Sequence, residues 1–106
     1  MSSEFGLSLE DRSTLNDIFS SFPEIEKVVV FGSRAKGTHK MGSDVDLAIY
    51  GNFKPELINQ VWGILENESP LPYQFDLVAV DDLIDEALLD HINRVGKVFY
   101  EGHTAD

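Results

Sequence analysis

The seven residues from Asp44 to Tyr50 constrain the fold most, because they alternate between apolar side chains and others. In an extended chain Val45, Leu47 and Ile49 lie on one side, opposite Asp44, Asp46, Ala48 and Tyr50. This period of two is typical of a β-strand with one face against a core. Asp is depleted in strands, and two carboxylates on one face repel each other. We therefore expect that this part of the strand either lies in water or binds a divalent cation.

The rest of the chain divides into segments whose patterns predict one element each. Helices are expected over 8–22, 54–67 and 82–95, and three further strands over 27–31, 73–80 and 97–100. A loop is expected from Gly32 to Gly42, with one helical turn at its start, and a turn over 69–72. This order predicts an α/β (α+β) fold, a small mixed sheet with helices packed on it. The 106 residues suit a single domain over 1–106, with a core at about 27–100.

Several residues have expected roles in the packing of these helices. Ser8-x-x-Asp11 is a plausible cap for the first helix, and Pro23 ends it. Trp62 falls on the apolar side of the second helix and is interpreted as a core residue. In the third helix three residues are expected to point inward, Ile84, Leu88 and Ile92.

Asp76 interrupts the apolar sequence Phe75-Asp-Leu-Val, where packing offers no reason for a charge. In a strand it points to the face opposite that of Phe75 and Leu77. If its strand is a neighbour of the 44–50 strand, three carboxylates meet on one patch of sheet. Such a group suits magnesium, which keeps its other positions for water and phosphates. The alternative interpretations are a solvated acidic pair and an edge-strand charge that discourages aggregation.

The segment from Lys27 to Ser43 contains no Asp or Glu, but it holds four of the eight basic residues of the chain. Within it, Gly32 directly follows the first strand and allows a phosphate to approach the backbone. Ser33 and the amides after it could donate hydrogen bonds to that phosphate, and Arg34 and Lys36 could neutralise its charge. On charge alone, an anion site and a basic surface turn account for this segment equally well.

Composition excludes several classes of function. The formal net charge of −11 is opposite to that of a duplex nucleic-acid binder, and without cysteine there are no disulfides or thiolate zinc sites. The longest apolar runs have four residues, too few for a membrane span, and no secretory signal is visible. A cytoplasmic protein is therefore expected. The three histidines lack metal-ligand spacing and are interpreted as surface residues.

Two known loop motifs fail at required positions. Gly32 to Gly37 falls short of a P-loop because Thr38 stands where the lysine is required. Asp44-x-Asp46 does not continue as a calcium loop, since Ala48 and Ile49 occupy the next ligand and glycine positions.

The chain resembles the nucleotidyltransferase superfamily related to the DNA polymerase β palm. The resemblance rests on Gly32-Ser33, ten intervening residues, Asp44-Val45-Asp46 and the later Asp76. The small size, the string FGSRAKGTHKMGSDVDLA, and Phe-Asp-Leu-Val followed by a helix are similar to the minimal nucleotidyltransferase (MNT) group. The resemblance covers roughly residues 27–100. Lys36 stands where many relatives carry arginine, which keeps the charge but loses the bidentate fork.

The resemblance implies an enzyme that transfers AMP from ATP to a hydroxyl with the help of magnesium. Asp44 and Asp46 would hold two magnesium ions, and Asp76 would join the site and help to deprotonate the attacking hydroxyl. Gly32 and Ser33 would hold the nucleotide phosphates. A pair of metal ions can stabilise both the attacking and the leaving oxygen of an in-line displacement at phosphorus.

The acceptor is expected on another protein, because a chain of this length has little room for an acceptor site. The resemblance implies a HEPN-type toxin partner in a hetero-oligomer, neutralised by adenylylation of a tyrosine. Two other functions stay open. The chain could act as an antitoxin by complex formation without catalysis, or it could be a small-molecule nucleotidyltransferase, for example one that modifies aminoglycosides.

Overall fold

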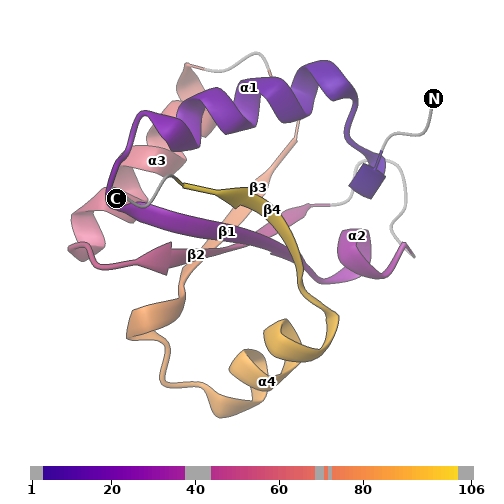
Figure 1. Ribbon diagram of the computed structural model, residues 1–106, viewed down its shortest axis with the longest axis vertical. Coiled ribbons are helices and arrows are strands. Elements are labelled where there is room, and N and C mark those ends of the chain that lie inside the picture. The colour runs from indigo at the N-terminus through magenta and orange to yellow at the C-terminus, as the bar shows by residue number, and fades with distance from the viewer. Residues whose placement is uncertain (1–3, 38–43, 69–70, 72, 103–106) are drawn as a thin grey trace.

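The computed structural model describes residues 4–37, 44–68, 71 and 73–102, and they form a four-stranded mixed sheet with helices on both faces (Figure 1). The sheet has the order β3-β2-β1-β4. Its strands are β1 (Ile25–Phe31), β2 (Val45–Gly51), β3 (Phe75–Ala79) and β4 (Lys97–Glu101). β1 pairs antiparallel with β2 and β4, and β2 pairs parallel with β3. The predicted fold class is confirmed.

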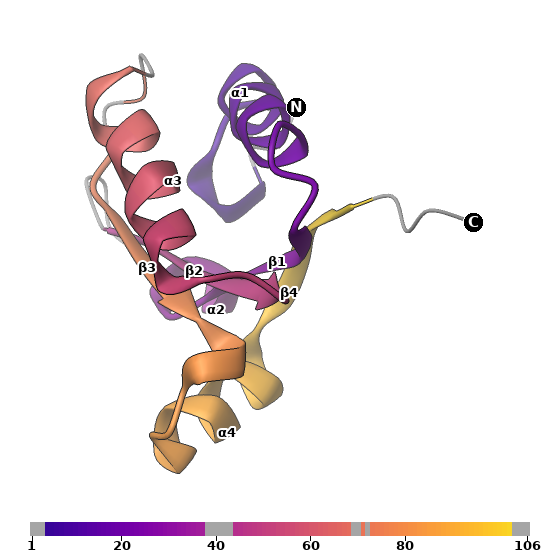
Figure 2. The same cartoon turned by 90° about the vertical axis from the view of Figure 1, so that its left-hand side faces the viewer.

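The helices lie in two layers. α1 (Leu9–Ser20) and α3 (Pro55–Asn67) cover one face of the sheet, and α4 (Glu86–Val95) lies on the other, as Figure 2 shows. Three shorter elements complete the described chain, which are η1 (Glu4–Gly6), α2 (Ser33–Lys36) and η2 (Val80–Asp82). None of the helices in the described ranges combines the length and apolar character that crossing a membrane requires.

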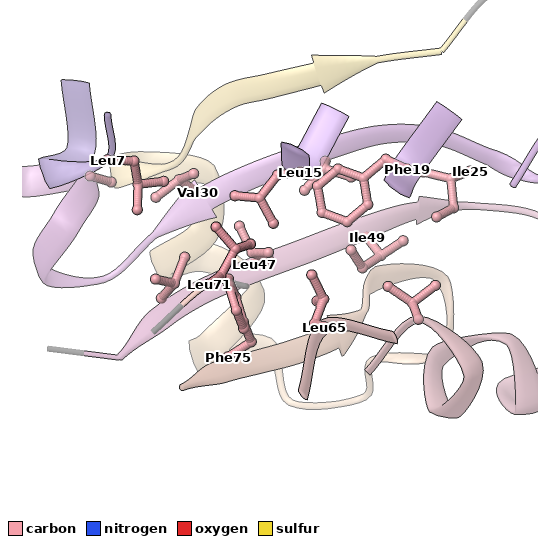
Figure 3. Packing of buried hydrophobic residues seen from close by; sticks show 14 of the residues in the cluster. Leu7, Leu15, Phe19, Ile25, Val30, Leu47, Ile49, Leu65, Leu71 and Phe75 are labelled. Atoms are coloured by element: carbon pink, nitrogen blue, oxygen red, sulfur yellow. The ribbon is translucent and has the colours of Figure 1, made fainter. Parts of the chain in front are cut away.

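The larger core lies between the sheet and the layer of α1 and α3. Leu15 and Phe19 of α1 point toward Leu47 and Ile49 of β2, and Leu65 of α3 closes the cluster (Figure 3). Val45, Leu47 and Ile49 are all buried there, which confirms the predicted alternation of β2. A smaller cluster on the other face, between the sheet and α4, contains Val29, Phe31, Ala48, Val80 and Ile92.

The helix boundaries follow local capping chemistry. The backbone N–H of Asp11 donates to the Ser8 hydroxyl oxygen at 3.0 Å, which confirms the predicted cap of α1. The expected helical turn after Gly32 is α2. Residues 38–43 of the expected loop, and 69, 70 and 72 of the expected turn, lie outside the described residues.

Two expectations about apolar side chains are wrong. Ile84 is 94% exposed, because α4 begins only at Glu86 and Ile84 belongs to the link that precedes it. Asp85 caps this helix by accepting a hydrogen bond from the backbone N–H of Leu88 at 3.1 Å. Trp62 is 46% exposed, since the buried stripe of α3 consists of Leu57, Val61 and Leu65.

Candidate functional site

Asp46 and Asp76 lie side by side on neighbouring parallel strands. The register of β2 and β3 pairs Asp46 with Asp76 directly. Phe75 and Leu77 pack into the larger core, so Asp76 between them points to the α4 face, as Asp46 does. Asp44, one residue before β2, is exposed, and its position two residues from Asp46 places it toward the same face. The structure therefore brings together the two strands that sequence analysis could only assume to be neighbours.

The electrostatics of Asp46 reflect its burial and its two acidic neighbours. Burial is the main cause that raises the pKa of Asp46 above its usual value, and the charges of Asp76 and Asp44 raise it further. The charges of His91 and Arg34 act in the opposite direction and lower it. Asp46 is half-buried, whereas Asp44 and Asp76 are exposed. Its ionised form is thus destabilised by its surroundings in the absence of a cation.

Gly32 makes room for the carboxylate of Asp46. It follows β1 directly, and Phe31, the last residue of that strand, pairs with Asp46 in the sheet. The backbone of Gly32 has φ +74° and ψ −154°, a region open essentially to glycine. A Cβ on this residue would overlap Oδ2 of Asp46. Gly32 and Asp46 therefore lie directly against each other, although ten residues separate Ser33 from Asp44 along the chain.

Arg34, expected to neutralise phosphate, lies inside the protein. Its side chain is 3% exposed, and Nη1 donates a hydrogen bond to the backbone carbonyl of Phe5 at 2.8 Å. The guanidinium carbon lies 5.1 Å from the centroid of the Tyr73 ring. Tyr73 in turn donates from its hydroxyl to Oδ2 of Asp11 at 2.6 Å. These contacts give Arg34 a structural role, while the neighbouring Lys36 is exposed at the end of α2.

His91 packs beside the strand that pairs with Asp46, although it was expected to be a surface residue. It is half-buried on α4, and its ring meets that of Phe31 edge to face, with centroids 6.1 Å apart and an interplanar angle of 83°. The signal for it was the apolar stripe itself, because His91 stands three residues after Leu88 and four before Val95. Both of these residues pack on the smaller core.

The donor set fits a hard divalent cation by its chemistry. Asp44, Asp46 and Asp76 offer carboxylate oxygens, the ligands that magnesium prefers, and their mutual repulsion is what a bound cation relieves. Within the described residues, however, no group of three His, Cys, Asp or Glu side chains is arranged to hold a metal ion. The roles of these aspartates as metal ligands, and of Gly32, Ser33, Arg34 and Lys36 as nucleotide contacts, stay predictions.

Comparison with known families points to one of them. The model of the family described as "Polymerase beta, Nucleotidyltransferase" matches residues 13–104, which include every residue of the site discussed above. No curated protein matches the chain.

Solved structures share the fold. A chain from a crystal structure of a toxin–antitoxin with AMP-PNP is 19% identical, with a TM-score of 0.71, over 86% of this chain and 73% of that one. A chain from a mutant of the toxin–antitoxin MntA–HpeT, in which two aspartates two residues apart are changed to glutamate, is 16% identical, with a TM-score of 0.68. That match covers 85% of this chain and 72% of the other. A proposed nucleotidyltransferase from Sulfolobus solfataricus is 22% identical over 85% of this chain and 76% of its own, with a TM-score of 0.52.

Proposed function

We propose, because this chain belongs to the polymerase beta nucleotidyltransferase family, that it transfers AMP from ATP to a hydroxyl group with the help of magnesium. The acceptor in this proposal is a tyrosine of a HEPN-type toxin, which the chain neutralises as its antitoxin. ATP as the donor suits a reaction in the cytoplasm.

One observation carries the enzymatic part of the proposal. Asp46 and Asp76 are paired across β2 and β3, and Asp46 fits against Gly32 at the end of β1. Acidic side chains next to a glycine-serine corner can serve both halves of the reaction. The carboxylates attract the cations that accompany a nucleotide, and the corner accepts its phosphates.

The proposed reaction forms one phosphorus–oxygen bond and breaks another. The acceptor oxygen attacks the α-phosphorus of ATP, the bond to the β-phosphate breaks, and pyrophosphate leaves. Asp76 would take the proton of the acceptor hydroxyl, Asp44 and Asp46 would hold two magnesium ions, and Ser33 and Lys36 would bind the phosphates. When bound, the ions supply positive charge to the attacking and the leaving oxygens.

The structural neighbours support a toxin partner and a nucleotide substrate. Two of them come from toxin–antitoxin complexes, and one of these was crystallised with AMP-PNP. The mutant of the second complex changes two aspartates with the same spacing as Asp44 and Asp46. The HEPN class and the tyrosine acceptor come from the resemblance to the MNT group.

The test is transfer of label from ATP to the partner. The purified chain is incubated with magnesium, ATP labelled at the α-phosphate and the product of the gene beside its own, and the modified residue is located by mass spectrometry. Label on a tyrosine is expected, and it should disappear with Asp44→Asn. The exposed Asp82→Asn in η2 serves as the matched control and should transfer label normally.

Two results would contradict the proposal. No transfer by the wild-type chain, or transfer that survives Asp44→Asn, would count against an enzyme of this kind. An Asp46→Asn variant that still relieves the growth arrest caused by the toxin, with unchanged binding, would favour neutralisation by complex formation alone. Modification of an aminoglycoside by the isolated chain would instead favour a small-molecule transferase.

A further inference from the structure

His91 is the polar ring that α4 places on the face of the sheet that carries the aspartates. The buried contacts of α4 are apolar, with Ile92 in the smaller core and Leu88 and Val95 packed against it. His91 lies on the same side of the helix, and its edge-to-face contact with Phe31 holds the ring against β1. The helix on this face is visible below the sheet in Figure 2.

Phe31 connects the ring of His91 to Asp46. Phe31 contacts His91 and is also the residue that pairs with Asp46 between β1 and β2. The charge of His91 also acts on Asp46 and lowers its pKa. A molecule bound over Asp46 and Asp76 would therefore have His91 at its border.

The polar atoms of this ring are available to a ligand. His91 makes no hydrogen bond and no ion pair with any residue that the structure describes, and it is only half-buried. An aromatic edge fixed by packing keeps the ring in place, while its nitrogens retain the capacity to donate. A ring held in this way loses little further freedom when it binds.

A triphosphate at this site needs hydrogen-bond donors, and the Arg34 guanidinium already contacts other groups of the protein. The chain as a whole repels a nucleotide through its formal net charge of −11, so local N–H groups must offset that repulsion. Arg34 already donates to Phe5 and lies over Tyr73. Among the other described basic side chains, Lys36 is exposed at the end of α2, and His91 acts electrostatically on Asp46.

We propose, on the basis of the function proposed above, that His91 binds the triphosphate by donating a hydrogen bond from a ring nitrogen to a phosphate oxygen beside Asp46. It thereby supplies from α4 a contact that the glycine-serine corner and Lys36 supply from the other side of the site.

The test measures nucleotide binding without turnover. α,β-Methylene-ATP is the probe, because its bond between the α- and β-phosphates cannot be broken by transfer, and affinity is measured by calorimetry with magnesium present. His91→Phe keeps the ring and its contact with Phe31 but removes both nitrogens. It should bind the probe about 10- to 100-fold more weakly, the effect of losing one hydrogen bond to a charged group. His91→Gln restores a donor and should recover part of the affinity.

Arg94→Gln is the matched control for charge. Arg94 also lies on α4, but it is exposed and paired with Asp90 at 2.8 Å, so its loss should change the affinity less than twofold. Thermal unfolding of all variants should stay close to that of the wild type. If His91→Phe fails to fold, His91→Leu, which also lacks both nitrogens, takes its place in the comparison with Arg94→Gln.

The outcomes separate this inference from the proposed function. Wild-type protein that binds the probe while His91→Phe binds equally well would overturn the role of His91 alone. A loss in Arg94→Gln as large as that in His91→Phe would also overturn it, because a general charge effect would then suffice. Wild-type protein that does not bind the probe at all would overturn both proposals.

Discussion

At the scale of single residues, the ionised Asp46 that the proposed function requires lowers the stability of the metal-free protein. Burial raises the pKa of Asp46 above the usual 3.8, and the charges of Asp76 and Asp44 add to this effect. The folded protein therefore holds this proton more tightly than the unfolded chain does. Its stabilising contribution is present below pH 3.8 and is lost as the pH rises through the folded-state pKa. At neutral pH without metal, the ionised Asp46 lowers the stability of the protein.

Asp46→Asn should consequently stabilise the metal-free protein while abolishing transfer. In EDTA at neutral pH we expect the Tm to rise by about 2–5 °C, and the gap to the wild type to narrow as the pH falls toward 3.8. Magnesium with nucleotide should raise the Tm of the wild type only. Thermal unfolding followed by circular dichroism measures all three effects. A lower Tm for the variant in EDTA would contradict this account of Asp46.

Gly32 and Gly37 form a matched pair of glycines at the two ends of α2. Both have positive φ, but a Cβ at Gly32 would overlap the Asp46 carboxylate, whereas a Cβ at Gly37 meets no atom within 4 Å. Gly37→Ala should cost about 1–2 kcal/mol of backbone strain and leave nucleotide affinity intact. Gly32→Ala should cost about 1–3 kcal/mol from strain and also displace Asp46, with loss of nucleotide binding. Urea unfolding and calorimetry together check this pair, and equal nucleotide affinity in both variants would refute the steric argument.

At the scale of elements, α4 shows how a cap decides which apolar residues are buried. The spacing of Ile84, Leu88 and Ile92 is helical throughout, yet only the last two pack on the smaller core. η2 ends at Asp82, and Asp85 caps the next helix, so Ile84 stands between two separate elements. Periodicity indicates a face only after the helix that carries it has begun.

Two substitutions test this boundary. Ile84→Ser should change the free energy of unfolding by no more than about 0.5 kcal/mol, because the side chain already lies in water. Ile92→Ala should lower that free energy by about 2–4 kcal/mol through the cavity it leaves between α4 and the sheet. Chemical unfolding measures both. A loss above about 1 kcal/mol for Ile84→Ser would restore the longer helix that the sequence predicted.

At the scale of the whole molecule, Arg34 joins segments that lie far apart along the chain. Its guanidinium on α2 reaches the carbonyl of Phe5 in η1 and the ring of Tyr73 just before β3. Tyr73 then contacts Asp11 of α1. These contacts connect α2 to α1, which packs on the larger core. Burial of this charge also places it where it affects Asp46 without reaching solvent.

The variants Arg34→Met and Lys36→Met distinguish a basic side chain that stabilises the fold from one that binds nucleotide. Each removes one positive charge from α2, but only Arg34 is buried. Arg34→Met should lower the free energy of unfolding by about 1–3 kcal/mol, because the Phe5 carbonyl loses its donor. Lys36→Met should leave stability within about 0.5 kcal/mol and weaken nucleotide binding several-fold. If Arg34→Met kept full stability and lost nucleotide affinity, Arg34 would be a phosphate ligand after all.

The order of the main helices and strands, and the faces of the two strands that carry the site, could be predicted from the sequence. The period of two over residues 44–50 placed Asp46 opposite the core, and the same rule placed Asp76 opposite Phe75 and Leu77. These predictions succeeded because the direction of a side chain in a strand depends on the backbone of its own neighbours.

The tertiary structure alone decided which of these residues meet. Four contacts join separate segments of the chain. They are the pairing of β2 with β3, the contact of Asp46 with Gly32, the hydrogen bond of the buried Arg34 and the packing of His91 on Phe31. No local pattern contains this information, because each contact results from packing two cores on opposite faces of one sheet. The residue types at the site can thus be recognised in the sequence, while their arrangement depends on long-range packing.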